Sequence, residues 1–134
     1  MRATQLSSRL GQFDTILMMG SNFGLFGNVN RARWLLRKMY NMTSTDARII
    51  AESADIYDTK RKTHLDYHKW NRKRGKLSGQ LKIRIRYAQY IGAWFEYLKV
   101  SRDEMTMILE GTGWQISRFI PETGGIYVGI IEKN

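Results

Sequence analysis

Two histidines are the residues in this sequence best suited to moving a proton near neutral pH. His64 and His68 are four residues apart, so in a helix they would share one face. Histidines at this spacing can also bind a metal ion, but a zinc site needs three or four ligands. The chain has no cysteine and no HExxH motif to complete such a set. We therefore expect no metal site, and we take His64 and His68 as the candidate catalytic bases.

The positive charge of the chain is concentrated around these histidines. The net charge is +10, and the segment from Lys60 to Arg86 contains 11 of the 22 lysines and arginines but one acid, Asp66. A charge confined to one segment indicates a local purpose. Aromatic residues are interleaved with the basic ones at Tyr67, Trp70 and Tyr87, a pattern that also suits binding of phosphates and stacked bases. A nucleic-acid-binding module is therefore one alternative function.

One stretch, FDTILMMGSNFGLFGN from Phe13 to Asn28, would organise the elements that position these residues. Its apolar and β-branched run from Thr15 to Met19 predicts a strand covered on both faces. An amphipathic helix is predicted from Asn30 to Asn41, with Asn28 or Asn30 as its cap. The connecting loop has three glycines, Gly20, Gly24 and Gly27. A strand, a loop and a helix in this order hold small ligands at the carboxyl ends of strands in α/β proteins.

The remaining sequence predicts short strands, turns and one further helix. We expect a polar turn at residues 43–46 and a strand at 47–51, which leaves Glu52 and Ser53 at its carboxyl end as candidate ligand contacts. The later elements are a hairpin of strands 80–87 and 94–100, a helix 101–110 that starts with a capping box of Ser101 and Glu104, and strands 114–120 and 126–131.

Several of these segments together resemble a known family. The stretch FDTILMMGSNFGLFGN and the later segments RIIAESADIYDT, YHKWNRKRG, GAWFEYL and EGTGW resemble, in that order, the second half of class I S-adenosylmethionine-dependent methyltransferases. The resemblance implies an α/β fold with a partial Rossmann-like methyltransferase sheet of mixed parallel and antiparallel strands, lacking the N-terminal cofactor-binding strands. Residues 1–134 would form a single truncated domain, with a basic, cap-like insertion at about residues 58–80.

The resemblance also implies roles for individual residues. The cofactor would be S-adenosylmethionine, and the reaction would be transfer of its methyl group to an acceptor. The turn Gly20, Ser21 and Asn22 would line the methionine side of the cofactor. The substrate pocket, for an acidic or small polar acceptor, would be walled by Phe23 and Phe26 and capped by the insertion through Tyr67, Asn71, Arg72 and Arg74.

The glycine-rich turn and following acid that hold this cofactor in the family have no counterpart in this sequence. The strand at residues 15–19 would also lack one neighbour, and an apolar edge strand promotes association. We therefore expect a homo-oligomer, or pairing with a missing N-terminal half, and activity only in the completed assembly. A non-catalytic interaction or relic domain is a further alternative.

The hydropathy of the sequence indicates where in the cell the protein is expected. No run approaches the roughly 18 apolar residues of a membrane-spanning helix, and the first residues do not have the apolar core of a signal peptide. We expect a soluble, cytoplasmic protein that does not bind membranes.

Overall fold

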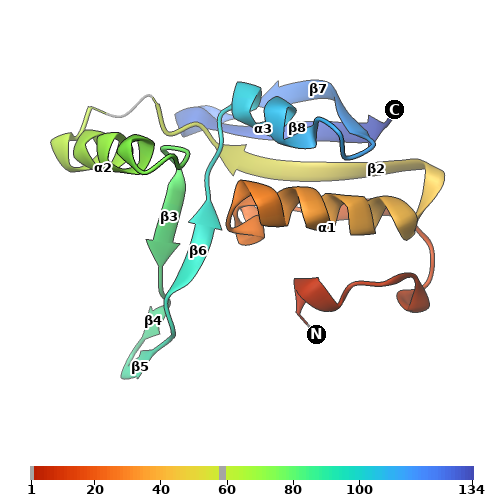
Figure 1. Cartoon of the computed structure of the whole chain (residues 1–134), viewed down its shortest axis with the longest axis horizontal. Helices are drawn as coiled ribbons and strands as arrows, with labels where there is room; N and C mark the ends of the chain where they lie inside the picture. Colours follow the sequence, from red (N-terminus) through yellow and green to blue (C-terminus); the bar gives the residue numbers. More distant parts are fainter. Residues whose placement is uncertain (1, 58–59) are drawn as a thin grey trace.

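A four-stranded sheet forms the centre of the computed structural model, which describes residues 2–57 and 60–134. The strands lie in the order β1-β2-β8-β7; β1 and β2 run parallel, and the other neighbours are antiparallel (Figure 1). This mixed sheet confirms the expected fold class. Its strands are β1 (Phe13–Met18), β2 (Thr43–Ala54), β7 (Trp114–Pro121) and β8 (Ile126–Lys133).

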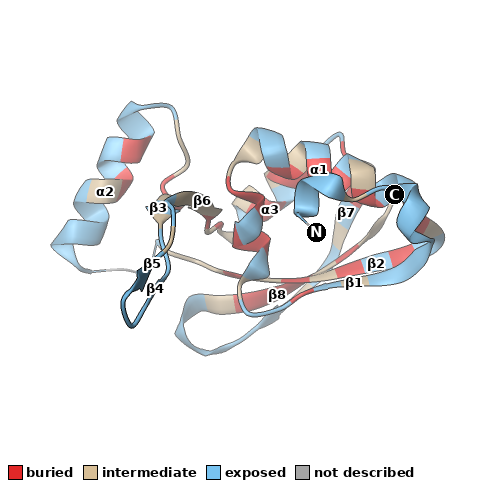
Figure 2. Cartoon of the chain, turned by 90° about the horizontal axis from the view of Figure 1, so that it is seen from below, coloured by how far each residue is buried: buried red, intermediate tan, exposed pale blue. Residues whose placement is uncertain are grey.

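Two helices, α1 (Val29–Asn41) and α3 (Arg102–Leu109), cover one face of this sheet (Figure 2). The Asn28 side chain caps α1 by accepting from the Arg31 N–H at 2.9 Å. The capping box of α3 forms as expected, since Ser101 Oγ accepts from the Glu104 N–H and Glu104 Oε1 accepts from the Ser101 N–H.

The basic side chains of α1 do more than face solvent. The Arg33 guanidinium donates to the carbonyls of Met107 and Ile108, at 3.0 and 3.2 Å, near the end of α3. Arg37 reaches the carbonyl of Gly111, just past that end, at 3.4 Å. These cations add hydrogen bonds to carbonyls at the end of α3 and just past it, and the Met107 carbonyl also accepts from the Glu110 N–H.

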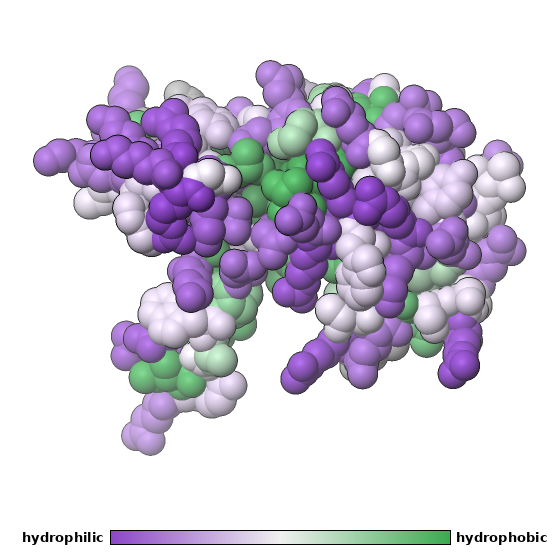
Figure 3. Space-filling view, viewed as in Figure 1, coloured by the Kyte–Doolittle hydropathy of each residue, from purple (hydrophilic) through white to green (hydrophobic). Residues whose placement is uncertain are grey.

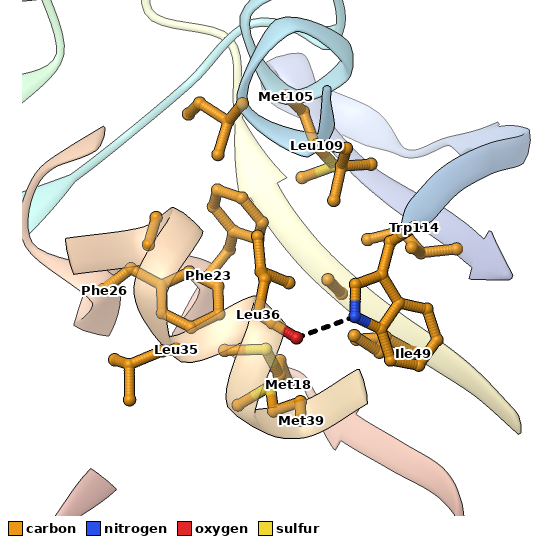
Figure 4. Close-up of a cluster of buried hydrophobic side chains, with 14 of the residues drawn as sticks. Met18, Phe23, Phe26, Leu35, Leu36, Met39, Ile49, Met105, Leu109 and Trp114 are labelled. Atoms are coloured by element: carbon orange, nitrogen blue, oxygen red, sulfur yellow. Dashed lines mark hydrogen bonds between the residues drawn. The ribbon is translucent and has the colours of Figure 1, made fainter. Parts of the chain in front are cut away.

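The core lies between the helices and the sheet. Residues of β2 alternate, so that Ala47, Ile49 and Ala51 are fully buried against the helices. Trp114, 2% exposed, donates from Nε1 to the Leu36 carbonyl at 2.8 Å and thereby joins β7 to α1 (Figure 4). Such a bond allows a large aromatic ring to be buried without an unpaired polar atom.

The expectation that the first strand is covered on both faces is wrong. Strand β1 is an edge of the sheet, and within the described chain no helix covers the face opposite α1 and α3. Met18 points into the core, but Leu17 is 66% exposed. The register places Leu17 beside Ile50, and Ile50 beside Ile130, so an apolar row crosses the open face.

The polar turn expected at residues 43–46 is also wrong, because β2 already begins at Thr43. The register pairs Phe13 with Thr43, and the Phe13 N–H donates to the Met42 carbonyl at 3.1 Å. Sheet hydrogen bonds thus override the turn tendency of this polar sequence. At its other end β2 extends three residues past the strand expected at 47–51, to Ala54.

The basic insertion and the hairpin that follows it lie beside the four-stranded sheet. The described part of the insertion begins at residue 60, so residues 58 and 59 of the expected insertion lie outside the described chain. The expected hairpin is confirmed, but the strand predicted at residues 80–87 is broken around Ile85, whose carbonyl accepts from the Gly92 N–H. The elements are α2 (Lys62–Lys73), β3 (Gln80–Ile83), β4 (Arg86–Tyr87), β5 (Tyr90–Ile91) and β6 (Phe95–Leu98).

Four short 3-10 turns complete the described elements: η1 (Ala3–Gln5), η2 (Ser8–Leu10), η3 (Asn22–Phe26) and η4 (Thr123–Gly125). None of the described helices combines the length and the apolar character needed to cross a membrane.

The Trp114 bond gives a test of this core. We expect Trp114→Phe to lower the free energy of unfolding by about 1–3 kcal/mol, because it removes a buried hydrogen bond and part of a buried ring. Trp70→Phe is the control, since Trp70 is 50% exposed, and its effect should stay within about 0.5 kcal/mol. Urea unfolding measures both, and equal losses would contradict this account of the core.

Candidate functional site

The turn that follows β1 presents open backbone at the carboxyl end of the parallel pair. Gly20 has φ +68°, a conformation that glycine adopts easily, and it is exposed. A Cβ built at this position would meet nothing within 4 Å. Asn22, also exposed, starts the 3-10 turn η3. The turn therefore offers an accessible surface where α/β folds bind ligands.

Ser21, the middle residue of this turn, is held from two sides. Its N–H donates to Glu52 Oε1 at 2.8 Å, and its hydroxyl lies 3.3 Å from the same oxygen. Its carbonyl accepts from the Tyr97 hydroxyl, which belongs to β6. Ser21 has φ 59°, an uncommon value for a residue with a side chain, and these contacts fix it there.

Sequence reasoning identified Glu52 as a candidate contact but missed Tyr97. Burial raises the pKa of the Tyr97 hydroxyl, so this group stays a protonated donor near neutral pH. Gly24 makes room for the ring, because a Cβ at Gly24 would overlap Tyr97. The glycine was visible in the sequence, but nothing there connected it with a tyrosine more than 70 residues away.

The two phenylalanines expected to wall the substrate pocket lie in the core. Phe23 and Phe26 are 0% and 1% exposed, and their rings meet edge to face at 5.0 Å. They pack with residues of α1 beneath the turn (Figure 4). Their burial favours a packing role that supports the turn and argues against direct contact with a substrate.

Helix α2 lines two cavities, and the larger of these two, of about 590 Å³, lies between α2, β3 and the end of β2. It brings together His64, His68 and Tyr67, three residues that the sequence had singled out. The apolar part of the lining comes from Ile56, Leu81 and Ile83, and the charged part from Asp55, Lys82 and Lys99. Two lysines against one aspartate suit a small ligand with an acidic or polar group.

The other expected cap residues have different surroundings. Asn71 is 1% exposed, and its amide donates to the carbonyls of Ser78 and Gln80, at 3.2 and 2.8 Å. Asn71 therefore fixes the connection from α2 to β3, although it also borders a second cavity of about 160 Å³. Arg74 stacks on Trp70 at 3.7 Å beside that smaller cavity, and Arg72 is exposed.

The two histidines differ in exposure. His64 is exposed, whereas His68 is 7% exposed. Burial lowers the pKa of His68 below 6.5, and the nearby charge of Arg72 lowers it further. His68 is therefore a neutral imidazole near pH 7, the form that can accept a proton. Among residues 2–57 and 60–134, no group of three potential metal ligands of the His, Cys, Asp or Glu type comes together.

The hairpin connects the turn to the larger cavity. Tyr97, which binds Ser21, pairs across the hairpin with Leu81, which lines the cavity. One two-stranded element thus contacts both candidate sites. The turn and the cavity are parts of one arrangement, with the open backbone at one end and the histidines at the other.

Comparisons with known proteins identify the fold. No protein-family model and no curated protein matches this sequence. Among solved structures, a SAM-dependent methyltransferase from Bacteroides fragilis, in complex with S-adenosyl-L-homocysteine, matches 91% of the chain with a TM-score of 0.71 and 21% identity. A SAM-dependent methyltransferase from Methanosarcina mazei matches 99% of the chain with a TM-score of 0.65 and 14% identity.

These likenesses show that the chain has a class I methyltransferase fold, as the sequence segments indicated. The CcbJ methyltransferase from Streptomyces caelestis gives a TM-score of 0.65 at 5% identity. The chain spans 48% of the Bacteroides fragilis protein, 65% of the Methanosarcina mazei protein and 62% of CcbJ. It therefore corresponds to a part of the domain in these structures.

The Glu52 contact can be tested directly. We expect Glu52→Gln to lower the free energy of unfolding by about 1 kcal/mol, because a charge-assisted bond to the Ser21 N–H becomes a neutral one. Hydrogen exchange at the Ser21 amide should accelerate. Glu122→Gln removes an exposed carboxylate and is the control. Unchanged protection of the Ser21 amide would contradict the contact.

His68 makes stability depend on pH. Its pKa is lower in the folded chain than in the unfolded one, so below pH 6.5 the unfolded state binds more protons. The free energy of unfolding should fall as the pH falls through this range, and His68→Gln should reduce the fall. An NMR titration should show that the pKa of His68 is below 6.5, and Arg72→Gln should raise that pKa. A His68 pKa at or above 6.5 in the wild type would contradict the argument from burial.

Proposed function

We propose that this chain is the acceptor-binding part of an S-adenosylmethionine-dependent methyltransferase and that it acts in an assembly that completes the sheet. The observation that carries this proposal is the turn at Gly20, which has open backbone and is held by Glu52 and Tyr97, in a chain with a methyltransferase fold. A structure with this fold, from Bacteroides fragilis, contains S-adenosyl-L-homocysteine.

The residues present fit one side of such a cofactor site. The open space at Gly20 would admit the methionine end of the cofactor, and exposed Asn22 could donate to it. Ser21 would shape the turn, because its N–H is already bound to Glu52. When bound, the cofactor would supply an electrophilic methyl group. The contribution of the protein to such a transfer is mainly to orient the acceptor.

The larger cavity would hold the acceptor. Lys82 and Lys99 favour an acidic or small polar molecule, and the apolar residues of the lining would bury its remainder. His68, with its lowered pKa, would take a proton from the acceptor nucleophile, and exposed His64 is the alternative base. Tyr67, which lines both cavities, would position the acceptor.

The open edge and face of the sheet would receive the completing partner. Phe13 and Leu17 of β1 are 42% and 66% exposed, and Met19, just after the strand, is 42% exposed. The solved structures with this fold contain further chain that has no counterpart here. A second copy or a separate N-terminal half could pair along β1, and either would bury these side chains.

Calorimetric titration of S-adenosyl-L-homocysteine, with the mass in solution measured by light scattering, tests this proposal. We expect micromolar binding by an assembled form. Leu17→Lys should weaken both assembly and binding, because it places a charge on the face to be covered. Ile120→Lys, at the opposite edge of the same sheet, is the control and should change neither. A monomer that binds no cofactor at millimolar concentration would contradict the proposal.

A further inference from the structure

The tip of the hairpin is a projecting arm, defined here as residues 84–94. It extends away from the rest of the molecule, and among the described residues β4 and β5 form a two-stranded sheet of their own (Figure 1). Its large side chains face solvent: Ile85 is 62% exposed, Tyr87 79%, Tyr90 66% and Trp94 58%. Exposed side chains of this size, gathered on one element, mark an interaction surface.

The side chains of the arm are arranged in pairs. Tyr87 and Tyr90 are direct cross-strand partners, so they lie on the same face of the tip. Arg86 and Ile91 form the next pair, on the other face. Near the base of the arm, the Arg84 guanidinium lies 4.6 Å from the centre of the Trp94 ring. The arm therefore offers flat aromatic surfaces with guanidinium groups beside them.

The charge of the arm has one sign. Arg84 and Arg86 of the arm are exposed, as is Lys82 just before it, and the sequence from Gln80 to Phe95 contains no aspartate or glutamate. The space-filling view shows hydrophilic and hydrophobic residues side by side on this projection (Figure 3). A partner must therefore bring negative charge as well as flat or apolar groups.

Charge complementarity decides between the possible partners. A second copy of this chain would bring its own net charge of +10, so arm-to-arm association would place like charges together. Nucleic acid supplies phosphates at regular spacing and bases that stack on aromatic rings. In a duplex the bases are already stacked on one another, so exposed tyrosines and tryptophan favour a single strand.

We propose that the arm binds single-stranded nucleic acid. Arg84 and Arg86 contact phosphates, and bases stack on Tyr87, Tyr90 and Trp94. The inference rests on the exposure, pairing and charge of the arm, and it is independent of cofactor binding at Gly20. Binding is sequence-tolerant, because each base has a face that can stack.

Fluorescence anisotropy with a labelled single strand of about 20 nucleotides tests the proposal. Replacing Tyr87, Tyr90 and Trp94 singly by alanine should weaken binding about fivefold to a hundredfold for each ring that stacks a base. Trp34→Ala is the matched control, because Trp34 is 43% exposed and has Lys38 at 4.3 Å from its ring, but lies on α1. This control should bind as the wild type does.

The contribution of charge can be measured separately. Arg84→Gln with Arg86→Gln should reduce the slope of log affinity against log salt by about 1.4, at about 0.7 per phosphate contact. Arg9→Gln with Arg48→Gln removes the same charge from exposed positions outside the arm, and should change the slope less. Circular dichroism and the S-adenosyl-L-homocysteine titration should match the wild type for every arm variant, so failure here is distinct from failure of the cofactor site.

Four outcomes would overturn the inference. Equal binding of the single strand and its duplex would exclude base stacking. So would arm variants that bind as tightly as the wild type. Equal loss in the two double-arginine variants would assign binding to net charge alone. Loss of self-association in the arm variants, with unchanged oligonucleotide binding, would make the arm an interface between copies.

Discussion

The carboxylate of Glu52 holds together the part of this molecule on which the rest of the candidate site depends. It joins the end of β2 to the turn after β1, and the Tyr97 hydroxyl joins the same turn to the hairpin. Ser21 therefore lies where the sheet and the hairpin meet. These bonds help to set the position of the open backbone at Gly20 relative to the hairpin that lines the cavity with the histidines. A site that orients two reactants needs such rigidity, because small misplacements are costly in rate.

The exposed edge and face of the sheet are consistent with a chain that forms part of a larger structure. One face carries two helices and a core of fully buried side chains, whereas the other carries an apolar row that starts at exposed Leu17. A strand with its backbone edge and one face open to water contributes little burial to stability. The geometry thus agrees with the solved structures of this fold, in which the corresponding segment is accompanied by further chain.

Local signals in the sequence predicted the local features well. The capping box at Ser101, the apolar period of α1 and the turn glycine Gly20 each act within a few residues, so their consequences could be inferred. Features set by distant partners could not. Thr43 joins a strand because Phe13 pairs with it, although its own neighbours favour a turn.

The same limit applies to the candidate site. The pairing of His64 with His68 followed from their spacing on one helix, whereas Tyr97 enters through a contact between segments far apart in the chain. The resemblance to the methyltransferase family implied a substrate-binding role for Asn71. Its burial and two backbone partners show that it fixes the chain itself.

The arginines of α1 also influence the order in which parts of the chain unfold. Helix α3 has eight residues, too few to persist alone in water, and carbonyls at its end are bound by Arg33. When α1 separates from the core, α3 loses these partners at the same moment. The two helices should therefore open as one cooperative unit, although 60 residues separate them in the chain. The projecting arm, residues 84–94, lies outside this unit, so it can move or be captured while the core stays closed.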